Sequence, residues 1–326
     1  MDRLVDRLIG PRVLLADAIH YARPEEFGLS AREVEVPAPR GLKLSGLWMD
    51  GPPEAPAVLF LPGNSANLSG HLPYLEVLGR AGVRALGLDY SGFGRSGGRP
   101  SLRGLIGDAE AGLEALKRLA GPAAPLGVFG VSLGAGLGME LAARRREIGA
   151  VAAEGLSIQR EAVRGLLQEG CMGPRWVRSV RDQGGPAEPR PRHRLARSGA
   201  WSRGSLIPRS LSRLAEATYP FAGKDPRRAA GRLGRRPVFI AHGARDALLP
   251  FEAALLVHRA LAGPRRLWII PEAGHAQEPA ILCGEEYALQ LEDFFRQAFS
   301  ARPPAAAEVE WRAERSGDRC RATIEL

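Results

Sequence analysis

Ser132 stands between Gly130 and Gly134 in the stretch GVFGVSLGAG, which occupies residues 127–136. The apolar residues before it are typical of a buried strand, and the residues after it are typical of a helix. In that context the pattern Gly-x-Ser-x-Gly predicts a strained turn that presents a nucleophilic hydroxyl, and the glycines remove side chains that would collide there. Ser132 is therefore a candidate nucleophile for acyl transfer.

A serine hydroxyl is a weak nucleophile at neutral pH and needs a base beside it. Of the six histidines, His275 is the one that lies just past a strand near the C-terminus, in IIPEAGHAQ, where a loop can carry it over a sheet edge. The imidazole in turn needs a carboxylate that sets its tautomer. Asp246, on the loop after the strand RRPVFIAHG, is the favoured acid, and Glu154, at the end of AVAAE, is the alternative.

Acyl transfer also needs hydrogen-bond donors for the oxyanion of the tetrahedral intermediate. The backbone N–H of Leu133, directly after the serine, supplies one donor. The loop LPGNSAN follows an earlier apolar run, and its Gly63 lets the backbone approach a substrate closely. We expect the second donor to be the backbone N–H of Asn64.

The elements that must position these residues follow one another in a regular order. Strand and helix patterns alternate at least five times along the chain, which predicts an α/β fold with a mostly parallel central sheet flanked by helices. In such sheets the reactive groups gather at the carboxyl ends of the strands. Four strand ends carry, in chain order, the oxyanion loop, the serine, the acid and the histidine, so a single sheet edge can assemble the whole set.

The alternation is interrupted between residues 160 and 218, where Pro, Gly and Arg are frequent and no strand pattern is clear. An inserted cap over the carboxyl edge of the sheet would interrupt the order in this way. We therefore divide the chain into five parts. They are a leader helix (1–24), a first core part (25–159), the cap (160–218), a second core part (219–300) and a C-terminal tail or hairpin (301–326).

The net charge of +9 is concentrated in one segment. Residues 174–213 hold ten arginines against Asp182 and Glu188, and only three of the 45 basic residues of the chain are lysines. Because the rest of the chain is nearly neutral, we expect no nucleic-acid partner. No ligand cluster and no phosphate-binding strand-loop-helix pattern is present either, so we expect no metal and no organic cofactor.

The first residues, the apolar segments and the cysteines bear on where the protein resides. Asp2 and Asp6 stand where a signal peptide would carry positive charge, and no segment approaches the roughly 20 apolar residues that span a bilayer. Three cysteines lie far apart, which argues against a disulfide framework and suits a reducing compartment. We expect a cytoplasmic protein whose apolar leader can associate at most weakly with a membrane surface. The oligomeric state stays open.

Together these motifs resemble the α/β-hydrolase superfamily, in the branch of monoglyceride-lipase-like and serine-aminopeptidase-like hydrolases. The stretch LGLDYSGFGRSGGRPS is similar to that branch's Asp-Tyr-x-Gly-x-Gly-x-Ser-x-Gly loop, and GVSLGAG and HGARDALLP match their counterparts. The resemblance implies catalytic roles for Ser132, Asp246 and His275, and a structural role for residues 89–98. One departure is Pro62, which stands where relatives usually carry histidine.

The chemistry of these residues predicts a serine hydrolase that cleaves a carboxylic ester, a thioester or a small amide through an acyl-serine intermediate. An acyltransferase would use the same residues, with an alcohol or amine in place of water. A non-catalytic interaction protein on a hydrolase scaffold is the third possibility. In the first two cases the partner is a small-molecule acyl substrate.

Overall fold

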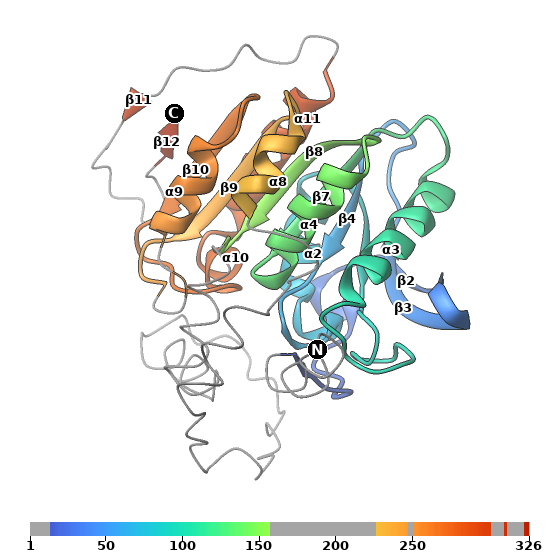
Figure 1. Cartoon of the computed structure of the whole chain (residues 1–326). Coiled ribbons are helices and arrows are strands. Elements are labelled where there is room, and N and C mark those ends of the chain that lie inside the picture. The colour runs from blue at the N-terminus through green and yellow to red at the C-terminus, as the bar shows by residue number, and fades with distance from the viewer. Residues whose placement is uncertain are drawn as a thin grey trace, which may run out of the picture.

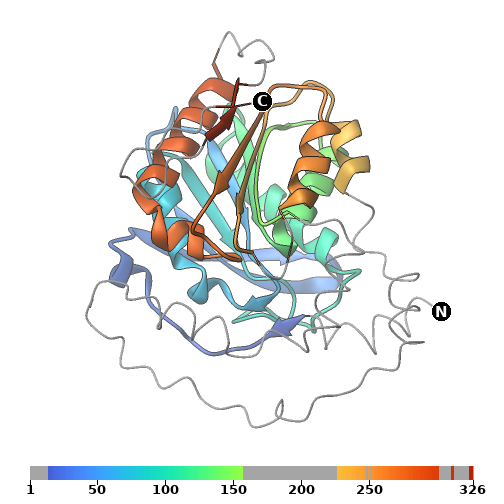
Figure 2. The same ribbon diagram turned by 90° about the vertical axis from the view of Figure 1, so that its left-hand side faces the viewer.

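The structure is a computed structural model of the chain. It describes residues 14–156, 226–246, 249 and 251–300, and the backbone of two short strands at 310–311 and 323–325. These residues form a ten-stranded sheet with helices on both faces (Figures 1 and 2). The expected cap at 160–218 lies outside the described residues, as do much of the expected leader and of the tail.

Six neighbouring strands of the sheet run parallel. In spatial order they are β10 (Arg265–Ile270), β9 (Val238–Gly243), β8 (Ile148–Glu154), β7 (Leu126–Val131), β4 (Ala57–Leu61) and β6 (Arg84–Leu88). Their residues are mostly apolar and buried, as expected of strands that are covered on both faces. The prediction of an α/β fold with a mostly parallel central sheet is confirmed.

Antiparallel strands extend both sides of this parallel block. On one side lie β3 (Leu42–Met49) and β2 (Ala31–Ala38), and on the other lie β12 (Thr323–Glu325) and β11 (Glu310–Trp311). β12 pairs with both β10 and β11. The residues near the C-terminus therefore contribute two short strands to the edge of the main sheet.

The helices divide between the two faces of the sheet (Figure 2). One face carries α3 (Leu105–Ala120), α4 (Leu133–Arg144), α8 (Pro226–Leu233) and α9 (Glu252–Arg259), and the other carries α2 (Leu72–Arg80), α10 (Glu278–Leu282) and α11 (Gly284–Ala298). Successive residues of a strand point to opposite faces, so Leu59 joins the apolar cluster beneath α3 and α4 while Phe60 joins the cluster beneath α2 and α11.

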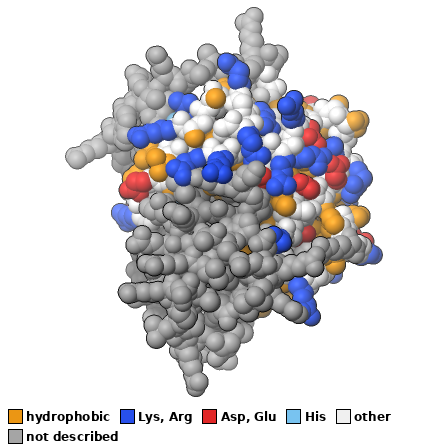
Figure 3. All heavy atoms as spheres, in the orientation of Figure 1, with side chains coloured by type: hydrophobic (Ala, Val, Ile, Leu, Met, Phe, Trp, Pro, Cys, Tyr) orange, Lys and Arg blue, Asp and Glu red, His pale blue; other side chains and the backbone are white. Residues whose placement is uncertain are grey.

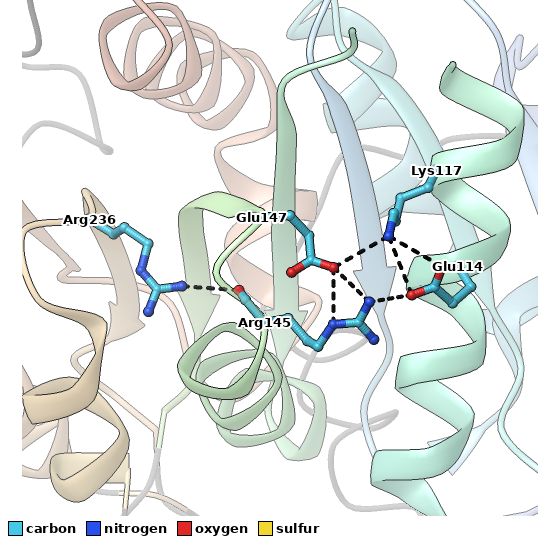
Figure 4. Close-up of polar contacts among 5 residues, drawn as sticks. All are labelled: Glu114, Lys117, Arg145, Glu147 and Arg236. Carbon is cyan, nitrogen blue, oxygen red and sulfur yellow. Dashed lines mark hydrogen bonds and ion pairs between the residues drawn. The ribbon is translucent and has the colours of Figure 1, made fainter. Parts of the chain in front are cut away.

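Polar contacts hold the far end of α4 against its neighbours (Figure 4). Arg145 pairs with Glu114 of α3 and, at 2.6 Å, with Glu147, which also lies 3.4 Å from the ammonium group of Lys117. Arg236 donates hydrogen bonds to the backbone carbonyl oxygens of three residues at this end of α4 and the start of β8, Ala142, Arg145 and Ile148. These contacts anchor the helix that begins directly after Ser132.

Basic side chains are spread over the described surface that Figure 3 shows, with acidic side chains among them. Arg228 and Arg232 of α8 are exposed, and Arg232 pairs with the buried Glu140 of α4. The arginine-rich segment 174–213 lies outside the described residues. Within the part that the structure describes, no helix is long and apolar enough to cross a membrane. Cys283, between α10 and α11, is disulfide-bonded, which the cysteine spacing does not predict.

Candidate active site

The backbone turns sharply between β7 and α4, and Ser132 occupies this turn with φ +53° and ψ −112°. A positive φ is unfavourable for a residue with a side chain, so the turn is strained. A Cβ atom on Gly130 would lie 2.0 Å from the carbonyl oxygen of Gly134, and a Cβ atom on Gly134 would lie 1.9 Å from the carbonyl oxygen of Leu61. Both positions therefore require glycine, and the strand-to-helix turn has the form that the sequence pattern predicts.

Ser132, His275 and Asp246 lie in hydrogen-bonded series at the carboxyl edge of the sheet. Ser132 Oγ is 3.0 Å from His275 Nε2, and His275 Nδ1 is 2.7 Å from Asp246 Oδ2. Since a carboxylate only accepts hydrogen bonds, Nδ1 donates to Asp246 and leaves Nε2 free to accept from the serine hydroxyl. The series thus places the imidazole in the tautomer that a general base for Ser132 needs.

The Asp246 carboxylate is held by its own loop as well as by His275. Its Oδ1 accepts a hydrogen bond of 2.8 Å from the backbone N–H of Leu249, and its Oδ2 lies 3.4 Å from Nε2 of His242. Burial alone would raise the pKa of this carboxyl. Electrostatic attraction to His275 and His242, together with the hydrogen bonds that these side chains donate, outweighs burial and holds the pKa well below its ordinary range. Asp246 is therefore an ionised partner for His275.

Glu154, the alternative acid, has a different set of contacts. Its Oε1 accepts a hydrogen bond from the hydroxyl of Tyr74, while its Oε2 has no hydrogen-bond partner within the described part of the chain, although the hydroxyl of Tyr287 lies close by. The side chain is buried, and burial raises the pKa of its carboxyl from 4.5 to about 7. His275 Nδ1 donates its hydrogen bond to Asp246 rather than to Glu154.

Tyr74 links Glu154 to the loop that carries His275, and the sequence offered no signal for this role. The Tyr74 hydroxyl accepts a hydrogen bond from the backbone N–H of Gln277, and the side-chain amide of Gln277 donates to the carbonyl oxygen of Gly70 at 2.7 Å. Gln277 itself has φ +63°. A buried network thus fixes the strained turn two residues beyond the histidine.

The loop after β4 passes directly beside the serine. A Cβ atom on Gly63 would lie 3.8 Å from the Cβ of Ser132. Asn64 is buried, and its carbonyl oxygen accepts a hydrogen bond of 2.8 Å from the backbone N–H of Leu15. Leu133 is the first residue of α4, where a backbone N–H has no acceptor within the helix. The loop that carries Asn64 and the first turn of α4, which carries Leu133, thus both adjoin Ser132, and their roles as oxyanion donors stay predictions.

The described residues contain no group of three or more His, Cys, Asp and Glu side chains that could hold a metal ion. What the assembled side chains can do is acid–base and nucleophilic chemistry on an acyl group, because a hydroxyl, an imidazole and an ionised carboxylate stand in series beside a backbone loop.

Comparison with known proteins places the chain in a family. Residues 58–288 match the alpha/beta hydrolase family, and the chain belongs to that family. It is 23% identical over 300 residues to the uncharacterised protein YfhR of Escherichia coli K12, with 89% of this chain and 90% of that protein covered. The finer resemblance to monoglyceride-lipase-like hydrolases stays a prediction.

Two solved structures share the fold. An esterase of Pyrococcus furiosus has a TM-score of 0.64 and 19% identity, over 88% of this chain and 98% of that one. Est1E of Butyrivibrio proteoclasticus, solved with ferulic acid, has a TM-score of 0.58 and 21% identity, over 80% of this chain and 98% of that one. At these identities the likeness concerns the fold.

Proposed function

We propose that the protein is a serine hydrolase that cleaves a carboxylic ester of a small-molecule acyl substrate through an acyl-serine intermediate. One observation carries this proposal: Ser132 Oγ, the His275 imidazole and the Asp246 carboxylate are in series at 3.0 and 2.7 Å. Membership of the alpha/beta hydrolase family supports hydrolysis, and the name of the structural neighbour from Pyrococcus furiosus, an esterase, supports an ester as the substrate class.

In the first half of the proposed reaction, His275 Nε2 takes the proton of the Ser132 hydroxyl while Oγ attacks the acyl carbon. The backbone N–H groups of Leu133 and Asn64 hold the oxyanion, and each such donor is worth on the order of 10²–10³ in kcat. Asp246 stabilises the imidazolium that forms. His275 then passes its proton to the departing alcohol, which leaves the acyl group on Ser132.

In the second half, His275 takes a proton from a water molecule, whose oxygen attacks the acyl carbon. A second tetrahedral intermediate collapses, Ser132 Oγ leaves with the proton from His275, and the carboxylic acid is released. An added alcohol in place of water would give a new ester by the same steps, which is the acyltransferase alternative.

Hydrolysis of p-nitrophenyl esters from acetate to laurate tests the proposal, together with labelling by a fluorophosphonate. Wild type should hydrolyse at least part of the series and become labelled, and Ser132→Ala should lose both properties. Added alcohol should leave most of the product as free acid; predominant transfer to the alcohol would instead support an acyltransferase. A folded wild-type protein that neither turns over an ester nor reacts with the probe would refute the proposal and support a non-catalytic scaffold.

A further inference from the structure

The loop beside Ser132 is held from behind by a histidine that the proposed mechanism does not use. The backbone N–H of Gly63 donates to Nε2 of His71 at 3.3 Å, and Nδ1 of His71 lies 3.0 Å from the carbonyl oxygen of Asn67. Because a carbonyl oxygen only accepts, Nδ1 carries the proton and Nε2 is the acceptor for Gly63. Both neighbours therefore require a neutral imidazole in a single tautomer.

The surroundings of His71 keep the ring in this state and position. The side chain is 2% exposed, and burial lowers its pKa, so the ring stays neutral. Its ring stacks on Tyr74 with an interplanar angle of 23° and is tilted against Phe60. A Cβ atom on Gly63 would meet Nε2 of His71 at 3.5 Å and Cβ of Ser132 at 3.8 Å. The Gly63 backbone is thus close to the imidazole and to the serine at once.

The amino-terminal residues 15–21 hold the same loop from a second direction. β1 (Leu15–Ala16) pairs in parallel with β5 (Ser65–Ala66), directly after the loop. The N–H of Leu15 donates to the carbonyl oxygen of Asn64 at 2.8 Å. Leu15 therefore bonds to the peptide group between Asn64 and Ser65. His71 bonds to the peptide group between Pro62 and Gly63.

Asn67 connects these two sets of contacts in one partly buried network. Its side-chain amide donates to Asp17 Oδ1 at 2.9 Å and to the carbonyl oxygen of Ile19 at 2.8 Å, and its own oxygen accepts from the N–H and the hydroxyl of Ser69. Its backbone carbonyl is the group that sets the tautomer of His71. A hydrogen-bonded path thus runs from the amino-terminal segment through Asn67 and His71 to Gly63.

We propose that His71 and the amino-terminal segment 15–21 are positioning elements of the oxyanion loop. They fix the two peptide groups that flank the Gly63–Asn64 peptide, and that middle peptide carries the N–H assigned to the oxyanion. Neither element takes part in the bond-making steps of the proposed reaction. Misplacing a donor by even a fraction of an ångström weakens its bond to the oxyanion while leaving ground-state binding intact. The inference rests on the proposed hydrolase function and adds to it the residues that orient the second donor.

Two matched pairs of variants separately test the contact of His71 with Gly63 and the contact of Leu15 with Asn64. His71→Leu fills the space but removes the acceptor for Gly63, whereas His71→Gln can bring its amide oxygen to the place of Nε2. Leu15→Pro removes the N–H that donates to Asn64, fixes φ and replaces the side chain, whereas Leu15→Ala keeps that N–H and shortens the side chain. For each variant kcat and KM are measured on the best p-nitrophenyl ester, with circular dichroism and thermal unfolding as controls of folding.

The expected result is a loss of kcat of tenfold or more in His71→Leu and Leu15→Pro, with KM within about threefold of wild type. His71→Gln should recover most of kcat, and Leu15→Ala should stay within about threefold of wild type. Affinity for a trifluoromethyl ketone, whose adduct with Ser132 carries an oxyanion, should fall in parallel with kcat. The affinity for the corresponding methyl ketone should change little.

Other outcomes would overturn the inference. It fails if folded His71→Leu keeps wild-type kcat and wild-type affinity for the trifluoromethyl ketone. It also fails if His71→Gln loses as much kcat as His71→Leu and both losses follow the loss of thermal stability, because His71 would then act through the fold alone. A wild-type protein that is inactive and unlabelled by fluorophosphonate would instead remove the proposed function, and the inference with it. The two failures are therefore told apart by the wild-type protein.

Discussion

The backbone N–H of Ser132 donates to the carbonyl oxygen of Glu154 at 2.8 Å. This bond joins the strained turn after β7 to the last residue of the neighbouring β8. The Glu154 side chain continues the connection through Tyr74 to the backbone of Gln277, two residues past His275. A single buried glutamate is thus connected by its backbone to Ser132 and, through Tyr74, by its side chain to the loop of His275.

Asp246→Asn and Glu154→Gln should separate the two carboxylates by their effect on turnover. An asparagine at 246 can hold His275 in the wrong tautomer, so kcat should fall by about 10³–10⁴. Glu154→Gln keeps an oxygen that accepts from Tyr74, so kcat should stay within about tenfold of wild type. Steady-state kinetics on one ester decides the matter, and the reverse ranking would assign the acid role to Glu154.

The burial of Glu154 predicts how stability depends on pH. Its pKa is raised from 4.5 to about 7, so the folded protein binds a proton that the unfolded chain has lost throughout that interval. The contribution of this carboxyl to the free energy of unfolding is present below pH 4.5 and is lost as the pH rises through about 7. The loss amounts to up to about 3 kcal/mol. The groups that face this carboxyl are Tyr74, Tyr287, His242 and His275.

Glu154→Gln removes this titration and leaves the facing groups in place. Urea unfolding measures the free energy of unfolding of wild type and Glu154→Gln at pH 5 and pH 8. From pH 5 to pH 8 the wild-type value should fall by about 2–3 kcal/mol more than the value of the variant. An unchanged difference between the two proteins at both pH values would show that Glu154 does not titrate in this interval.

Substitution by alanine at two glycines of α4 should change the stability of the protein in opposite directions. Gly134→Ala would drive a Cβ into the carbonyl group of Leu61, at 1.9 Å from its oxygen, so we expect several kcal/mol of destabilisation or failure to fold. At Gly136 the nearest atom is 3.9 Å away, in Pro226. Gly136→Ala should therefore stabilise the helix by about 0.5–1 kcal/mol. Denaturant unfolding measures both, and equal effects would contradict the tight turn.

Tyr74→Phe should weaken the loop of His275 without touching the three residues in series. The change removes one hydroxyl and leaves Glu154 Oε1 and the N–H of Gln277 without it, at a cost of about 1–3 kcal/mol in stability. A lowered kcat is expected as well, because the turn after His275 loses its anchor. The double variant Tyr74→Phe with Glu154→Gln should cost less than the sum of the two single changes, and strict additivity would show that the two residues act independently.

Much of the fold follows from local patterns in the chain. The runs AVLFL, LGVFGV and VFIAHG are short, apolar and bounded by turn residues, and each forms a strand covered on both faces. The glycines around Ser132 likewise announce the turn, because the steric demand that selects them acts between residues only a few positions apart.

Other features depend on contacts between distant parts of the chain. Tyr74 carries no motif, although it bonds to Glu154, 80 residues away, and to Gln277, 203 residues away. His71 appears in the sequence as a residue at the start of a helix, and only the packing of the loop beside Ser132 shows which two backbone groups it bonds.

The sequence by itself determined the parallel sheet, the turn at Ser132 and the strand ends at which reactive side chains stand, because apolar periodicity and glycine sterics are local properties. It left two carboxylates, Asp246 and Glu154, at the ends of adjacent strands. Tertiary structure decided which of them hydrogen-bonds His275, because the paths of the loops after β8, β9 and β10 set distances of a few ångströms that spacing along the chain does not encode.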